Sequence, residues 1–103
     1  MIRKPYVYAI SDGVHIKIGV AQCPHKRLKQ LATGNPNKLT ILGTFDGGYE
    51  LESELHKRFT KVRDNGEWFV PTESLLEYLN TNIQDKYITL INNQIKFYPK
   101  DKL

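Results

Sequence analysis

Three stretches of the chain predict β-strands, the first because its apolar and aromatic residues suit a pleated, half-buried surface and the other two because their residues alternate. The first stretch covers residues 5–11 and the second residues 14–20, with Asp12-Gly13 expected as a hairpin turn because glycine tolerates positive φ. The third stretch covers residues 39–45. In the second stretch the face expected to be buried carries Val14, Ile16, Ile18 and Val20. Lys17 falls on the opposite face, so we expect it to point away from the core.

Apolar residues at helical spacing predict three helices. The first begins at Pro24, which suits a first helical turn, and ends at Gly34. The second covers residues 49–60, and the third begins after Thr72 as its N-cap. The buried positions are expected to be Leu28 and Leu31 in the first helix, Leu51, Leu55 and Phe59 in the second, and Leu75, Leu76 and Leu79 in the third.

The remaining segments predict shorter β-structure. Residues 63–70 read as a turn into a brief strand or sheet edge. Residues 87–91 and 94–98 predict a hairpin around Asn92-Asn93, and the charged residues 99–103 are expected to fray. The order of elements indicates an α+β fold. We expect one domain, with a compact unit at residues 1–82 and an extension at residues 83–103 packed on it.

The composition limits the class of protein. A chain of 103 residues with 40% hydrophobic content is long enough for one modest core. It has neither an apolar run of membrane-spanning length nor a signal-peptide pattern at its start. A single cysteine, Cys23, fits a reducing compartment, and we therefore expect a cytoplasmic protein.

The charge pattern indicates contact with a polyanion. The formal net charge is +4 and the pI is about 9.2. The basic residues group in two blocks, which suits phosphate contacts on DNA. The candidate nucleic-acid-binding residues are Lys26, Lys29, Lys57, Arg58 and Lys61. Solvated helix faces would give the same charge pattern, so both interpretations stay open.

Five short motifs together resemble a known family. They are YVY at residues 6–8, KIG at 17–19, Arg27 eight positions after the last KIG residue, LESELHKRF at 51–59, and GEWF at 66–69. The combination is similar to the GIY-YIG nuclease superfamily, in the branch of phage and mobile-element proteins that has KIG in place of YIG. The resemblance covers roughly residues 6–79 and leaves residues 83–103 unexplained.

The resemblance implies both a fold and a site. The implied fold is a small antiparallel three-stranded sheet flanked by helices, followed here by a C-terminal helix and a β-hairpin extension. Members of the superfamily cut phosphodiester bonds with one divalent metal ion. The resemblance places the metal-binding carboxylate at Glu52 and the helix arginine at Arg27. Its two motif tyrosines fall at Tyr8 and Lys17, and Asn65 is the candidate for its late asparagine.

Elementary chemistry gives each of these residues a role. Glu52 would hold Mg²⁺ or Mn²⁺, and Arg27 would clamp the scissile phosphate. Tyr8 would orient or deprotonate the attacking water, with its pKa lowered by a nearby cation. Lys17 would supply that cation or act as the base itself. His56, one turn from Glu52, would relay a proton or contact the phosphate.

Structural roles stay open for the same residues. They are a core aromatic ring at Tyr8, an edge-strand charge at Lys17, a cover for apolar surface at Arg27, and a surface pair at Glu52 and His56. Glu67 is a candidate second metal ligand, although a structural role is favoured for it.

Two functions follow as hypotheses. The first is a metal-dependent endonuclease that hydrolyses phosphodiester bonds in DNA. The alternative is a nucleic-acid-binding or regulatory module of the same fold with little or no turnover. A chain this short leaves little room for a separate sequence-reading module. Specificity would then come from this domain, a homodimer or a partner protein.

Overall fold

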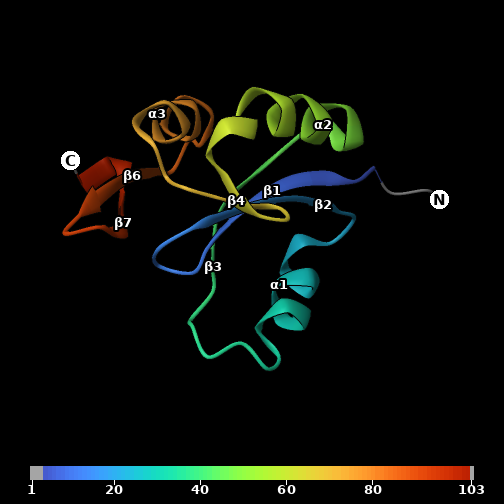
Figure 1. Cartoon of the computed structure of the whole chain (residues 1–103), viewed down its shortest axis with the longest axis horizontal. Helices are drawn as coiled ribbons and strands as arrows, with labels where there is room; N and C mark the ends of the chain where they lie inside the picture. The colour runs from blue at the N-terminus through green and yellow to red at the C-terminus, as the bar shows by residue number, and fades with distance from the viewer. Residues whose placement is uncertain (1–3, 103) are drawn as a thin grey trace.

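The computed structural model describes residues 4–102 and has an α+β fold built on a five-stranded antiparallel sheet (Figure 1). The strand order is β3-β1-β2-β5-β4. The strands are β1 (Tyr6–Ser11), β2 (Ile16–Ala21), β3 (Thr40–Phe45), β4 (Arg63–Asn65) and β5 (Trp68–Phe69). The α+β class is confirmed, but the three-stranded sheet is wrong, because β4 and β5 extend the sheet beyond β2.

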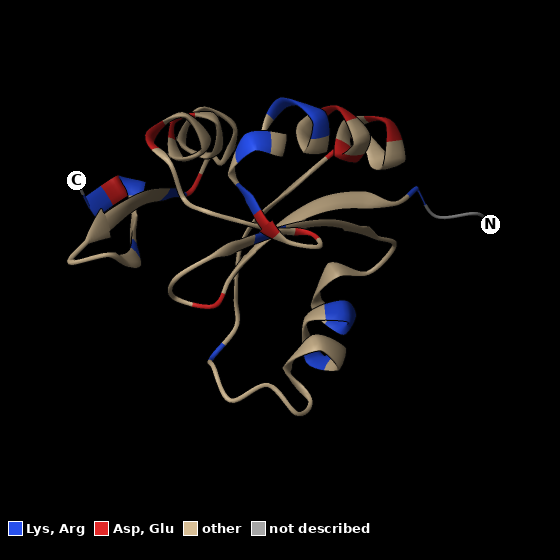
Figure 2. Ribbon diagram, viewed as in Figure 1, with Lys and Arg blue, Asp and Glu red and all other residues tan. Residues whose placement is uncertain are grey.

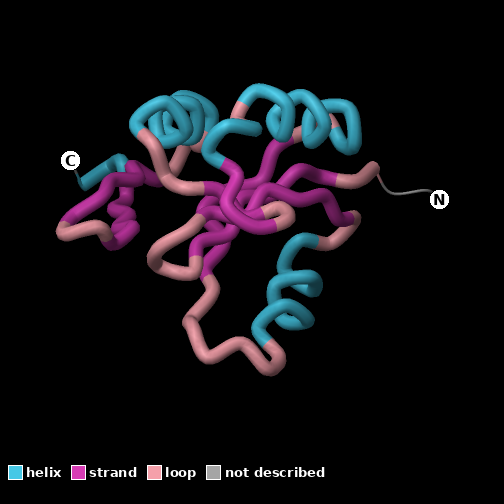
Figure 3. Tube along the Cα trace, viewed as in Figure 1, coloured by secondary structure: helices cyan, strands magenta, loops and turns pink. Residues whose placement is uncertain are grey.

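Helices cover both faces of this sheet (Figure 3). They are α1 (Pro24–Ala32), α2 (Gly48–Arg58) and α3 (Glu73–Asn82), with short 3₁₀ turns at η1 (Thr60–Val62) and η2 (Lys100–Lys102). Helices α2 and α3 lie on one side and α1 on the other, in agreement with the three predicted helices. Within the described part of the chain, no helix has the length and apolar character to cross a membrane.

Alternation along the strands divides the apolar residues between two cores. The larger core lies under α2 and α3 and includes Val7, Ala9, Ile16, Ile18, Leu42, Phe45, Leu55, Phe59, Phe69, Leu75 and Leu79. The smaller core lies under α1, where Leu28 and Leu31 pack near Tyr8, Ile10 and Leu39. The sheet is therefore buried on both faces.

Because both faces of the sheet are packed, the environment of Lys17 differs from the exposed one expected. Lys17 does lie on the face opposite Ile16 and Ile18, but α1 covers that face, and Lys17 is only 8% exposed. Its neighbour across the hairpin is Ile10. The start of β2 also differs, because Val14 lies in a four-residue connection rather than in the strand. The Asp12 carboxylate shapes this connection by accepting the backbone N–H groups of residues 14 and 15.

Strand β3 departs from simple alternation at Leu42. The pairing with β1 runs from Ala9–Gly43 to Ile10–Ile41, which leaves Leu42 as an extra residue. Because of the bulge, Phe45 packs in the larger core with Leu42, whereas Leu39 and Ile41 pack in the smaller one. The predicted strict alternation over residues 39–45 is therefore wrong at this point.

The predicted C-terminal hairpin is confirmed as β6 (Lys86–Ile91) and β7 (Gln94–Pro99). Asn92 and Asn93 form its turn with φ values of 53° and 63°, as a two-residue primed turn requires. The hairpin packs on the larger core through Ile88 and Ile95. The expected fraying after it is wrong at Lys100, whose ammonium donates hydrogen bonds to backbone carbonyls at the end of α3.

Lys100 should therefore contribute to stability. The substitution Lys100→Met removes the donor to the carbonyls of Asn80 and Ile83. It should lower the free energy of unfolding by about 1–3 kcal/mol in urea denaturation, since a charged donor is lost from two acceptors. Lys102→Met is the matched control, because Lys102 is exposed in the same 3₁₀ turn. Equal stability of the two variants would contradict an anchored C-terminus.

Candidate functional site

The candidate site lies at the edge of β2, where its pairing with β5 ends. Lys17 pairs with Trp68, and the next residue, Ile18, donates its N–H to the Glu67 carbonyl over 3.0 Å. The Ile18 carbonyl then accepts Nε2–H of His56 over 2.8 Å. A helix side chain thus takes the place of a strand partner, and this bond fixes α2 against the strand edge.

Gly19 follows directly and lies buried beside this edge. It pairs with Tyr8 across the β1–β2 hairpin. A Cβ at Gly19 would overlap the Tyr8 hydroxyl oxygen and lie 2.5 Å from its Cζ and 3.1 Å from Glu67 Oε2. The missing side chain therefore lets the Tyr8 hydroxyl and the Glu67 carboxylate approach the same place.

Three potential metal ligands meet at this edge. Glu52, His56 and Glu67 each offer one ligand atom, and these atoms lie within 4.8 Å of one another. A carbonyl can only accept, so the bond to Ile18 assigns the proton of neutral His56 to Nε2 and leaves Nδ1 as its lone-pair donor. A backbone carbonyl behind a ligating imidazole is a common support for metal-binding histidines.

Lys17 holds one of these carboxylates in place. Its ammonium lies 2.9 Å from Glu67 Oε2 and 5.7 Å from the centre of the Trp68 ring. Since Lys17 is buried and Glu67 is half-buried, the ion pair is shielded from water more than a surface pair. Lys17 is thus a partner of Glu67 rather than a free cation beside Tyr8.

Arg27 approaches the same place from α1. Arg27 is exposed, and its guanidinium donates a hydrogen bond to Gln30. It also lies close enough to Tyr8 to lower the pKa of the Tyr8 hydroxyl. Burial raises the pKa of Tyr8 above 10.0, although a hydrogen bond and the charge of Arg27 oppose the rise. The expected lowering of this pKa is therefore wrong: burial outweighs the cation, and Tyr8 is a neutral phenol at neutral pH.

Glu52 is also shifted toward its neutral form. Partial burial raises its pKa above 4.5, and the nearby Glu67 carboxylate raises it further. His56 and Lys17 act in the opposite direction. Two carboxylates are thus held close together at an electrostatic cost.

The predicted site residues are thus brought together: Tyr8, Lys17, Arg27, Glu52 and His56 all lie around the β2 edge. Asn65 lies elsewhere, in a polar pocket of about 250 Å³ with Asp64 and His15. Glu67 lies in the cluster with Glu52 and His56, whereas the sequence favours a structural role for it. Its position directly before a strand that pairs with the KIG strand was the signal that could have identified it.

The five candidate nucleic-acid-binding residues form two groups on different elements, among the blue segments of Figure 2. Lys26 and Lys29 lie on α1, and Lys57, Arg58 and Lys61 lie at the end of α2 and in η1. Arg58 is partly engaged, because its guanidinium stacks 5.3 Å from the Tyr78 ring and 5.4 Å from the Phe59 ring. The other four are exposed.

The fold and site define an α+β protein with a cluster of acidic, imidazole and basic groups at one strand edge. A family model, the T5orf172 domain, matches residues 5–83. The chain therefore belongs to the T5orf172 domain family. Neither the comparison with curated proteins nor that with solved structures found a match.

This finding corrects the assignment made from the short motifs. The matching model is of a different family from the GIY-YIG superfamily, so the resemblance to that superfamily is wrong. The roles of Glu52, Arg27 and Tyr8 cannot be taken from it. They depend on the geometry of the β2 edge, and the match ends at residue 83, before the β6–β7 hairpin.

Gly19→Ala should disrupt the site without unfolding the sheet. The new methyl group would overlap the rigid Tyr8 ring, so the ring must move away from Glu67. We expect a shift of the Tyr8 ring resonances by NMR and weaker divalent-metal binding. Gly34→Ala is a control for destabilisation alone, because Gly34 lies away from the site with open space around it but has a φ of +76°, which alanine adopts only with strain. An unmoved Tyr8 ring in Gly19→Ala would contradict the close approach.

Glu52→Gln should stabilise the metal-free protein at neutral pH. The pKa of Glu52 is raised in the folded state, so the ionised group costs stability once the pH exceeds its unfolded value of about 4.5. A neutral amide avoids this cost. Thermal unfolding in EDTA should show a higher midpoint than wild type at pH 7, with the difference vanishing toward pH 4. Glu54→Gln, on the exposed side of α2, should show no such pH-dependent gain.

Proposed function

We propose that this protein is a divalent-metal-dependent nuclease that hydrolyses phosphodiester bonds in DNA. The observation that carries the proposal is the meeting of Glu52, His56 and Glu67 within 4.8 Å, beside the Tyr8 hydroxyl and Arg27. A cation site and an arginine next to each other suit a negatively charged substrate whose charge grows during reaction.

The donor set fits a divalent ion. Two carboxylates and one imidazole offer oxygen and nitrogen, which Mn²⁺ accepts more readily than the oxygen-preferring Mg²⁺. A bound ion would neutralise charge on the phosphate and lower the pKa of a water molecule. Glu52 and His56 Nδ1 would be its main ligands, and Glu67 would supply the carboxylate oxygen that Lys17 leaves free.

Arg27 would bind the scissile phosphate. Its planar guanidinium can donate two parallel hydrogen bonds to phosphate oxygens, and its exposure leaves the side chain accessible to DNA. Lys26 and Lys29 on the same helix would add contacts to neighbouring phosphates, as Lys57 and Lys61 would from the other face of the sheet.

Tyr8 and Lys17 would act differently from the roles considered from sequence. A Tyr8 phenol with a raised pKa suits a hydrogen-bond donor that orients water or phosphate, and it is a poor base at neutral pH. Lys17 would keep Glu67 in position through their ion pair. His56 would be a metal ligand, because Nε2–H is already bonded to Ile18.

Metal binding and DNA cleavage test the proposal separately. Isothermal titration with Mn²⁺ should show one site in wild type, and binding should weaken by about tenfold or more when a ligand is removed in Glu52→Gln or Glu67→Gln. Supercoiled plasmid should be nicked or linearised with Mn²⁺, and Arg27→Lys should lower the rate at least about tenfold, because the planar fork is lost.

Glu54→Gln and His25→Asn are matched controls, because both residues are exposed and lie outside the cluster. They should bind Mn²⁺ and cut DNA as wild type does. Cleavage that survives in Glu52→Gln would refute the assigned site. Salt-sensitive DNA binding without cleavage, and with no Mn²⁺ site, would favour a binding or regulatory module instead.

A further inference from the structure

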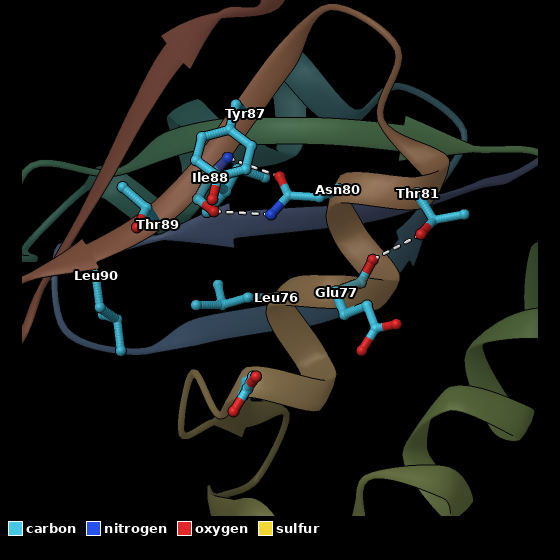
Figure 4. A pocket seen from close by; sticks show the side chains of 9 residues that line it. Leu76, Glu77, Asn80, Thr81, Tyr87, Ile88, Thr89 and Leu90 are labelled. Carbon is cyan, nitrogen blue, oxygen red and sulfur yellow. Dashed lines mark hydrogen bonds between the residues drawn. The ribbon is translucent and has the colours of Figure 1, made fainter.

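A groove lies on the other side of the molecule from the strand-edge site, between α3 and β6 (Figure 4). Its volume is about 600 Å³, and its lining combines apolar side chains with the edge of a strand. In Figure 4, Leu76 extends from the helix toward the strand, and Tyr87 and Leu90 lie along the strand.

The backbone of β6 is exposed to this groove. The Asn80 side chain accepts the Ile88 N–H over 2.7 Å and donates to the Ile88 carbonyl over 2.8 Å. Both backbone groups of Ile88 therefore point toward α3 rather than toward β7. Since this direction alternates along an antiparallel strand, the N–H and C=O of Leu90 point the same way.

Leu90 has no such partner within residues 4–102. No hydrogen bond joins its N–H or C=O to a loop, helix or side chain in that range. Leu90 is 38% exposed. The Asn80 side chain thus makes the hydrogen bonds to Ile88 that a neighbouring strand would make. The backbone of Leu90, two residues along the same edge, is available to pair with an added strand.

The charge of the groove indicates what would fit it. The charged residues that line it are Glu73 and Glu77, one helical turn apart on α3. No salt bridge involves either residue within the described part of the chain. In a protein of net charge +4 this acidic rim disfavours DNA and a second copy's acidic rim, and it favours a basic partner.

Neighbouring apolar residues extend the surface. Ile91 and Tyr98, which share a face of the hairpin with Tyr87, are at least 40% exposed, as Tyr87 is. The hairpin lies outside the matched family domain, which ends at residue 83. A cluster of large exposed apolar residues on one added element is typical of an interaction surface.

We propose that this groove binds a short extended segment of a partner protein in which apolar residues alternate with Lys or Arg. The segment pairs its backbone with Leu90, places an apolar side chain between Leu76 and Leu90, and directs basic side chains to Glu73 and Glu77. Strand addition of this kind supplies affinity through the backbone and selectivity through alternate side chains.

The test uses two synthetic peptides and the full chain labelled with ¹⁵N. One peptide alternates lysine with valine and leucine, and the other has glutamate in place of lysine. The basic peptide should shift the amide resonances of Leu90 and its neighbours and slow exchange of the Leu90 amide. The acidic peptide should have no effect on them.

Charge reversal at the groove distinguishes binding in the groove from nonspecific electrostatic attraction of the basic peptide to the protein. The double variant Glu73→Lys/Glu77→Lys should weaken binding of the basic peptide about tenfold or more and bind the acidic one, because the paired charges set the choice of partner. Glu50→Lys, at an exposed position of α2, should bind as wild type does.

Three outcomes would overturn the proposal. They are shifts confined to residues outside the groove, binding that is unchanged by charge reversal, and absence of binding by the basic peptide. Shifts at Leu90 caused by duplex DNA, or by raising the protein concentration alone, would assign the surface to nucleic acid or to self-association instead.

Discussion

The candidate site depends on how the backbone of Ile18 is paired. Its N–H bonds to the Glu67 carbonyl and its C=O to His56, so one residue of β2 fixes both the end of β5 and the position of α2. If β5 continued as a regular strand, its residues would cover the edge beside Gly19. If His56 did not donate its hydrogen bond to the Ile18 carbonyl, this buried acceptor would lose its partner, at a cost of about 1–3 kcal/mol. The short β5 and the helix side chain together give the Ile18 backbone both of its hydrogen-bond partners at the point where the pairing with β5 ends.

The second constraint is that both faces of the sheet are packed. Residues of α1 and α2 belong to different cores, so side chains from opposite faces can meet only around a strand edge. Gly19 removes the one Cβ that would separate them. Tyr8 and Arg27 then approach from the α1 face, and Glu52 from the α2 face. Because the two cores fix these helices independently, the site is held in place before any ligand arrives.

The sequence was informative where structure is set locally, and weak where it depends on distant partners. The helix around Leu55 and the Asn92-Asn93 turn follow from periodicity and turn chemistry, and both were predicted. Strands β4 and β5 confirm the brief strand or sheet edge predicted for residues 63–70, but at three and two residues they are too short for periodicity to predict their pairing beside β2. The burial of Lys17 required knowing that α1 covers the second face. The pKa direction of Tyr8 required knowing that burial outweighs Arg27. The short motifs identified residues that do meet, but assigned the wrong family.

The way the two carboxylates of the cluster are paired distinguishes a network that serves only stability from a site suited to a cation. A network that existed only for stability would pair each carboxylate, as Lys17 pairs Glu67. Glu52 instead has a raised pKa, because burial and Glu67 act against its charge more strongly than His56 and Lys17 support it. Replacing Glu52 by an apolar residue would remove that cost, so the carboxylate is explained poorly by stability alone. A divalent cation between Glu52, His56 and Glu67 would offset the repulsion between the two carboxylates, which supports the proposed metal site on physical grounds.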